Sequence, residues 1–293
     1  MMGHPFGMIL TGLMTRYIQR VPMVKHIIQS MLRQGMISNQ DDIINDHIAF
    51  RTIGVPHLGI QSLEKIFLHY GYTRQDEYNF KQKKVKAYWY APPRNEANLP
   101  RIFISELIVQ ELSKTAQGII NKYTNEAIGC PALSLDPNDV KATDECLHSP
   151  LWRTPDISDY RALQDESEYA SWVIYNRYYL NHFTISVHSL QEPYNKLEAF
   201  NNFLESIGVT LNDSGGKIKT SEDGYLRQSA SVAEQVTVKF PDGESYQYID
   251  IAGSFVEFAE RNIMPSGQRR DGFEASNADK IFESTFTDQT IKP

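Results

Sequence analysis

The feature that most constrains the fold of this chain is an order of secondary structure that occurs twice. In the first half, the alternation of polar and apolar residues predicts a strand over 47–53. A helix with apolar residues at helical spacing is expected over 59–71, where it ends at a glycine. Strands are then expected through 78–93 and over 100–109, which gives the order β-α-β-β-β.

The second half of the chain repeats this order. A strand is predicted over 180–189 and a helix ending at a glycine over 193–208, and further strands follow through 209–243 and over 245–261. The first strand of each half also starts with a polar residue and a histidine, in "DHIAFRTI" and "NHFTISVH". The repetition predicts an α+β fold built from two βαβββ modules with added helices.

We expect five segments along the chain, whose 293 residues suffice for two modules that share one core. Residues 1–40 form an N-terminal helical segment, 41–110 the first module, and 111–175 a helical and irregular insert rich in turn signals. Residues 176–262 form the second module, and 263–293 a C-terminal tail that packs on the modules.

Charge and composition exclude several classes of partner. The chain has 29 Lys and Arg against 36 Asp and Glu, and its one basic block is "KQKK" at 81–84, so a nucleic-acid partner is not expected. No stretch approaches the roughly 20 apolar residues that span a bilayer, so no membrane partner is expected either. Two cysteines without CxxC spacing indicate reducing surroundings, and from them we predict a cytoplasmic location.

Candidate functional residues lie on one face of three predicted strands. Alternate residues of a strand share a face, so His47 and Arg51 point the same way, about 13 Å apart at the usual rise per residue. His182 begins the equivalent face in the second half, and Glu257 lies between apolar residues in the last strand. Alternating polar residues are also typical of a sheet with one face in water, but the histidine recurs at the same place in both halves.

Two histidines and one carboxylate are a set of ligands suited to a divalent metal ion. Such a facial set leaves three coordination positions open on a non-haem Fe(II). Neutral imidazoles and a carboxylate also suit zinc or manganese, so the ligand types alone leave the metal open.

The sequence resembles the 2-oxoadipate dioxygenase/decarboxylase (hydroxyglutarate synthase) family of the vicinal-oxygen-chelate superfamily. The stretches that carry the resemblance are "NDHIAFRTI", "RIFISEL", "NHFTISVH", "GSFVEFAER" and "RRDGFEASNADKIFESTF". It implies a curved β-sheet cleft around Fe(II), with His47, His182 and Glu257 as the metal ligands. "VEFAER" is also similar to the closing strand of 4-hydroxyphenylpyruvate dioxygenases, which selects Glu257 over Glu260.

The resemblance further implies a substrate and a reaction. The substrate is a small 2-oxo dicarboxylic acid, 2-oxoadipate, which O₂ converts into 2-hydroxyglutarate and CO₂ as in lysine degradation. Arg51 would hold the distal carboxylate as a catalytic substrate-binding group, and Gln228 and Ser229 would contact the substrate. The alternatives are another metal-dependent 2-oxo acid dioxygenase or isomerase of the superfamily, and a non-catalytic ligand-binding module.

Two acidic residues near these motifs are expected to lie outside the ligand set. Strand alternation turns Asp46 to the face opposite His47, so we do not expect it to orient that imidazole. Glu106 in "RIFISEL" takes, by motif, the place in the first half that Glu257 takes in the second, and could be a former ligand.

Overall fold

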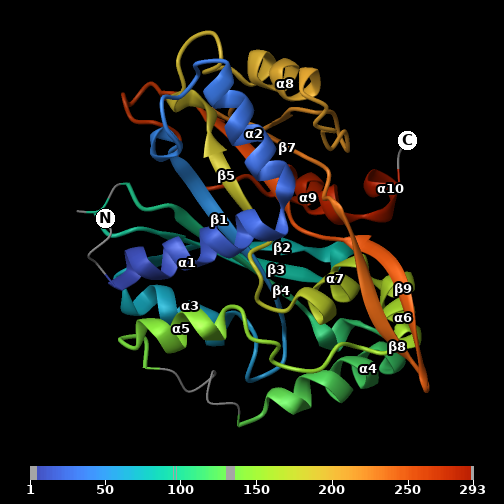
Figure 1. Ribbon diagram of the computed structural model, residues 1–293. Coiled ribbons are helices and arrows are strands. Elements are labelled where there is room, and N and C mark those ends of the chain that lie inside the picture. Colours follow the sequence, from blue (N-terminus) through green and yellow to red (C-terminus); the bar gives the residue numbers. More distant parts are fainter. Residues whose placement is uncertain (1–4, 95, 97, 130–135, 292–293) are drawn as a thin grey trace.

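The computed structural model describes all residues except 1–4, 95, 97, 130–135 and 292–293, and it contains a large curled sheet with helices around it (Figure 1). The strands are β1 (Asn45–Ile53), β2 (Thr73–Phe80), β3 (Val85–Ala91), β4 (Arg101–Leu107), β5 (His182–Ser186), β6 (Lys219–Thr220), β7 (Leu226–Ala230), β8 (Gln235–Asp242), β9 (Ser245–Ala252) and β10 (Phe255–Arg261). The α-helices are α1 (Pro5–Arg20), α2 (Pro22–Arg33), α3 (Ile60–His69), α4 (Lys114–Thr124), α5 (Val140–Cys146), α6 (Ile157–Glu166), α7 (Glu168–Asn176), α8 (Leu197–Ser206), α9 (Ala275–Phe282) and α10 (Thr287–Thr290).

The eight-stranded sheet is two copies of one arrangement joined at its centre. Its order is β2-β3-β4-β1-β5-β10-β7-β6, with β1 and β5 antiparallel in the middle. β4 runs parallel to β1 on one side, and β10 runs parallel to β5 on the other. Counted from the centre outward, the first half has the order β1, β4, β3, β2, and the second half has the matching order β5, β10, β7, β6. This symmetry confirms the predicted α+β fold of two βαβββ modules.

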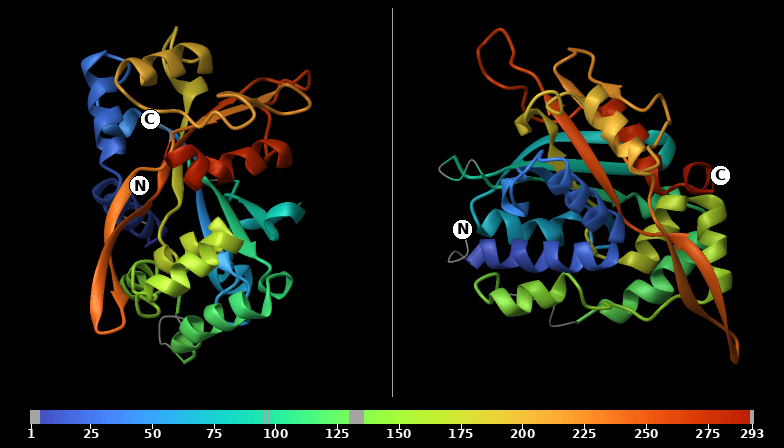
Figure 2. Two further views of the ribbon diagram at one scale, coloured as in Figure 1. Left: turned by 90° about the vertical axis from the view of Figure 1, so that its right-hand side faces the viewer. Right: turned by 45° about the horizontal axis from the view of Figure 1, so that its top comes forward.

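The second module contains a hairpin that the sequence pattern did not separate from the sheet. β8 and β9 form a two-stranded sheet of their own, and Figure 2 shows them as a long ribbon; β8 packs on α6, where Phe240 lies against Tyr160. The predicted strand over 245–261 is broken at Gly253, where a Cβ would lie 3.2 Å from the carbonyl oxygen of Glu234. The alternation of apolar residues continues across this break, and so it hid the change of partner.

The N-terminal helices cover one face of the central strands (Figure 1). The chain breaks between α1 and α2 before Pro22, as expected of a residue that lacks a backbone N–H. The Tyr17 hydroxyl donates to the carbonyl oxygen of Phe255, and its ring packs on Phe183 with 5.8 Å between centroids. Within the described part of the chain, every helix is too short or too polar to cross a lipid bilayer.

The tail helix α9 packs on the other face, where the sheet curls around it. It contacts β2, β6 and β7. Since β2 and β6 are the two edges of the sheet, contact with both means that the sheet closes partly around α9. The central strands β1, β5 and β10 are consequently covered on both faces, and nearly all of their residues are buried.

Candidate metal centre

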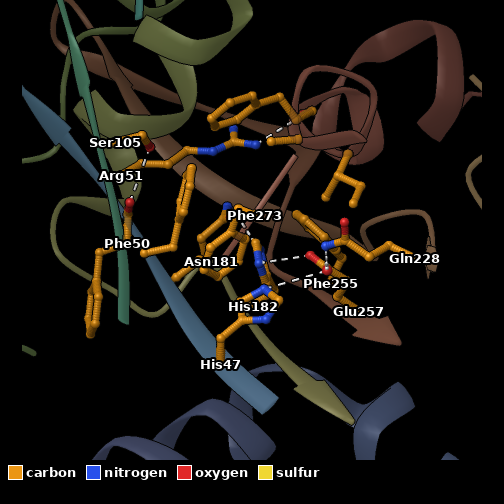
Figure 3. Close-up of a pocket in the computed structure, with 15 residues that line it drawn as sticks. His47, Phe50, Arg51, Ser105, Asn181, His182, Gln228, Phe255, Glu257 and Phe273 are labelled. Carbon is orange, nitrogen blue, oxygen red and sulfur yellow. Dashed lines mark hydrogen bonds and ion pairs between the residues drawn. The ribbon is translucent and has the colours of Figure 1, made fainter. Parts of the chain in front are cut away.

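Three neighbouring strands at the centre of the sheet each contribute one side chain to a buried cluster. His47 comes from β1, His182 from β5 and Glu257 from β10, and Figure 3 shows the three side chains pointing toward one another. One ligand atom of each lies within 4.8 Å of the others. The arrangement follows from the register, because Ala49 lies opposite His182 and Glu257 lies opposite Thr184, one alternate residue from each histidine.

Both imidazoles turn the same nitrogen toward the carboxylate. The Nε2 atom of His47 lies 3.4 Å from Oε1 of Glu257, and that of His182 lies 3.1 Å from Oε2. The Thr184 hydroxyl also lies 3.0 Å from Nε2 of His47. Two imidazole nitrogens and one carboxylate oxygen converging in a buried site match the ligands that divalent transition metals prefer, so the residues present fit such an ion.

The Nδ1 atoms face away from the cluster, each toward the preceding residue. His47 Nδ1 lies 2.9 Å from Oδ1 of Asp46, and His182 Nδ1 lies 2.9 Å from Oδ1 of Asn181. The prediction that Asp46 would not orient His47 is wrong. The pairing of β1 with β5 shifts by one residue between Asn45 and Ile48, so the alternation expected of a regular strand is interrupted around Asp46.

The electrostatics of the cluster favour the ionised form of Glu257, and they shift the pKa values of the two histidines in opposite directions. Burial would raise the pKa of the Glu257 carboxyl, but the two imidazoles outweigh burial and hold that pKa well below its usual range. Burial lowers the pKa of His182. Burial also acts to lower the pKa of His47, but the carboxylates of Glu257 and Asp46 outweigh it and raise that pKa.

The cluster lies in the wall of a cavity whose lining also includes Arg51, Asn181 and Gln228. Five phenylalanines line this cavity: Phe50, Phe103, Phe255, Phe273 and Phe282. Two of these rings flank the histidines, because Phe273 lies 4.8 Å from the His47 ring and Phe255 lies 4.6 Å from the His182 ring, centroid to centroid. The cavity is thus apolar apart from the cluster and a few polar groups.

Arg51 lines the same cavity as a buried cation, apart from the cluster (Figure 3). It is 1% exposed, and it donates to the Thr285 hydroxyl at 2.8 Å and to the carbonyl oxygen of Phe282 at 3.0 Å. The rings of Tyr169 and Trp172 lie about 5 Å from its guanidinium carbon. Burial lowers the pKa of Arg51 to about 10, so it stays charged near neutral pH. Among the residues described here, no carboxylate forms an ion pair with it.

The two substrate contacts predicted on β7, Gln228 and Ser229, lie on opposite faces of that strand. Gln228 lines the cavity, and its Nε2 donates to Oε1 of Glu257 at 2.6 Å. Its own oxygen accepts from Asn277 of α9 at 3.0 Å, so Gln228 orients the carboxylate. Ser229 faces away from the cavity and donates to Asn201 at 2.8 Å, so the structure does not bring it to the site.

Three further residues of the site were not singled out from the sequence. Asn181 lines the cavity and holds His182, Phe273 packs on His47, and Asn277 holds Gln228. The repeated polar residue before each histidine, in "DH" and "NH", is the one signal that could have pointed to Asn181. Phe273 and Asn277 lie in "RRDGFEASNADKIFESTF", a stretch that carries the family resemblance, but which of its side chains reach the site depends on how the tail folds back.

Glu106 is not the counterpart of Glu257, contrary to the motif alignment. The register pairs Ala49 with Phe103 in the first module and Thr184 with Glu257 in the second, so Phe103 takes the equivalent place. Glu106 instead corresponds to Glu260, because each is the next-to-last residue of the last strand of its module. Glu106 accepts from the Ile60 N–H at the start of α3 and pairs with Lys86. Glu260 likewise accepts from the Leu197 N–H at the start of α8 and pairs with Lys196.

Replacing Glu106 with Gln should therefore affect stability and leave metal binding unchanged. The amide oxygen can still accept from the Ile60 N–H, but the charge is lost, so we expect unfolding to become easier by about 1 kcal/mol. Denaturant unfolding would measure this loss, and metal content after reconstitution would serve as the second readout. A fall in bound metal would place Glu106 at the site after all.

The fold and the cluster together define a protein of the vicinal-oxygen-chelate type, with two fused βαβββ modules around one candidate metal site. A family model described as "2-oxoadipate dioxygenase/decarboxylase" matches residues 9–269. The chain belongs to this family.

Known proteins of similar sequence and structure agree with that assignment. The chain is 41% identical to the chloroplastic 2-oxoadipate dioxygenase/decarboxylase of Arabidopsis thaliana, over 97% of this chain and 78% of that protein. It is similar to the crystal structure of the Oryza sativa hydroxyglutarate synthase in complex with 2-oxoadipate, with a TM-score of 0.87, 39% identity and coverage of 97% and 93% of the two chains. The Pseudomonas putida hydroxyglutarate synthase shares the fold at 18% identity, with a TM-score of 0.59 and coverage of 89% and 64%.

The predicted cytoplasmic location is wrong in the light of these relatives. The Arabidopsis protein is named chloroplastic, and a 40% identical protein of Oryza sativa is named chloroplastic/amyloplastic, with 98% of this chain and 80% of that protein covered. A low cysteine count indicates only reducing surroundings, and those are not unique to the cytoplasm.

Proposed function

We propose that this chain is an Fe(II)-dependent dioxygenase that converts 2-oxoadipate and O₂ into 2-hydroxyglutarate and CO₂. The atoms balance, since both oxygen atoms enter the products while one carbon leaves as CO₂. Support comes from the named activity of the relatives and from the Oryza sativa structure in complex with 2-oxoadipate. The metal would be held by His47, His182 and Glu257, and when bound it would supply a Lewis acid for the 2-oxo acid and an electron source for O₂.

The observation that carries this proposal is a single cavity that contains both a three-donor cluster and a buried cation without an acidic partner among the described residues. A buried cation is costly unless an anion compensates it. A 2-oxo dicarboxylic acid supplies that anion at its distal end, while its 2-oxo acid end can face the cluster. Arg51 would bind the distal carboxylate through its planar guanidinium and thereby set which carbon lies nearest the cluster.

Two buried donors without partners support an acceptor-rich substrate. Arg51 Nε and Asn181 Nδ2 make no hydrogen bond, and both residues line the cavity. Burying an unpaired N–H costs free energy, so these two groups favour a ligand that brings several oxygen acceptors. The carboxylate and keto oxygens of 2-oxoadipate meet that requirement.

The other residues of the cavity make its wall apolar and fix the orientation of the Glu257 carboxylate. The five phenylalanines make most of the wall apolar, which lowers the local dielectric and strengthens the attraction between Arg51 and a carboxylate. Gln228 donates to Glu257 and is itself held by Asn277, so the carboxylate has one preferred orientation before any ligand enters.

The test is anaerobic reconstitution with Fe(II), followed by 2-oxoadipate and O₂, with oxygen uptake recorded and products identified by mass. We expect equimolar loss of O₂ and 2-oxoadipate, and label from ¹⁸O₂ in the products. 2-Oxoglutarate, one carbon shorter, and 2-oxohexanoate, which lacks the distal carboxylate, are matched controls and should react far more slowly. Metal binding without oxygen uptake would favour an isomerase, and no affinity for Fe(II) would favour a binding module.

A further inference from the structure

The two modules repeat a pair of adjacent residues in which the first accepts a hydrogen bond from the second. Asp46 accepts from His47 Nδ1 and Asn181 accepts from His182 Nδ1, each at 2.9 Å. All four residues are buried, so water does not compete for these bonds. A hydrogen on Nδ1 leaves the lone pair on Nε2, the atom that each imidazole turns toward Glu257.

In the first pair, the accepting residue is itself held by a buried cation. Asp46 receives two bonds from Arg261, from Nε to Oδ2 at 2.7 Å and from Nη2 to Oδ1 at 2.9 Å. Arg261 is 1% exposed, and its Nη1 donates to the carbonyl oxygens of Gly272 and Arg270 at 2.7 and 3.2 Å. Arg261 belongs to the same strand as Glu257, so β10 supplies one candidate ligand and the anchor for a second.

We propose that Asp46 is a positioning residue for His47 and that Arg261 holds Asp46 in place. The Asp46 carboxylate keeps the hydrogen of His47 on Nδ1 and fixes the orientation of the ring. The lone pair on Nε2 therefore already faces the metal site before the metal binds. Asn181 does the same for His182 with a neutral oxygen. The assignment rests on the metal site of the proposed function, and it adds residues that touch neither metal nor substrate.

A single substitution of Asp46 would leave Arg261 buried without its partner, so the test removes both charges together. In one double variant Asp46→Asn is combined with Arg261→Met, and in the other Asp46→Leu is combined with Arg261→Met. Both replace the buried ion pair with neutral side chains of similar size, a change that folded proteins tolerate. The two differ mainly in one acceptor, because Asn can bond to His47 Nδ1 as Asn181 bonds to His182, and Leu cannot.

The measured quantity is the dissociation constant of Fe(II), by anaerobic competition with a chromophoric chelator, with a melting curve for each variant. We expect the Leu variant to bind Fe(II) about 10- to 100-fold more weakly than the Asn variant, at similar melting temperatures. Equal affinities in the two double variants would overturn the proposal. If wild-type protein failed to bind Fe(II), the proposed function would fail instead, so the two failures can be told apart.

A second measurement uses unaltered protein and so does not depend on how the variants fold. In the Zn(II)-loaded wild-type protein, nitrogen-15 NMR should show His47 and His182 with a hydrogen on Nδ1 in slow exchange with water. Ligation of His47 through Nδ1, or an Nδ1 hydrogen that exchanges as fast as one exposed to solvent, would contradict the assignment.

Discussion

Replacing Arg51 with Met should raise the KM for 2-oxoadipate by about 100-fold or more and leave the bound metal in place. Removing one member of a buried ion pair costs about 3–5 kcal/mol, and each 1.4 kcal/mol corresponds to a factor of ten. Met is chosen because it fills similar space among Tyr169, Trp172 and Phe282 without a charge. Steady-state kinetics and metal analysis of the same preparation give both quantities.

A substrate without the distal carboxylate gives the control for this variant. If Arg51 binds that carboxylate, wild type and Arg51→Met should differ little with 2-oxohexanoate, because the interaction is absent in both. Arg51→Lys should fall between the two with 2-oxoadipate, since Lys keeps the charge but not the planar pair of donors. Loss of metal together with activity in Arg51→Met would make the residue structural.

Replacing Glu257 with Gln should abolish activity through loss of the metal. An amide oxygen is a weaker and uncharged ligand, and even the outer partners of metal ligands contribute 10- to 100-fold in affinity, so we expect binding at least 100-fold weaker. His47→Ala and His182→Ala should behave alike. Iron content after anaerobic reconstitution and desalting is the measurement, and full retention in any one variant would remove that residue from the ligand set.

Glu260→Gln is the matched control on the same strand. Glu260 is as buried as Glu257, but its oxygens contact Lys196, Arg227 and the Leu197 N–H rather than the histidines. This variant should lose stability and keep its metal. Equal loss of metal in both variants would mean that β10 had been disturbed as a whole, and the ligand would then have to be sought by a gentler change such as Glu257→Asp.

The candidate ligands could be predicted from the sequence because they depend on local patterns. Strand alternation gives the faces of His47 and Glu257, and the repeated order of elements joins their strands in one sheet, while the family resemblance selected Glu257 over Glu260. Ser229 also follows alternation, since Gln228 faces the cavity and its neighbour must then face the other way. The prediction that both contact substrate neglected this rule.

The remaining features depend on pairing and packing that no local pattern records. Asp46 contacts His47 next to a place where the pairing of β1 with β5 is irregular. Glu106 was equated with Glu257 by counting along motifs, whereas the strand register equates it with Glu260. The partners of Arg51, the Thr285 hydroxyl and the Phe282 carbonyl, come from the tail, more than 200 positions away.

The two modules differ at one place in the register, where the first has Phe103 and the second has Glu257. A strictly symmetric pair of modules would supply two histidines and two carboxylates, and an octahedral ion would then keep two positions for other ligands. Here Phe103 stands where the second carboxylate would be, and it packs against Phe273 in the cavity wall instead. With one carboxylate rather than two, the proposed metal would keep a third position, which is the number that a chelating 2-oxo acid and a molecule of O₂ would require together.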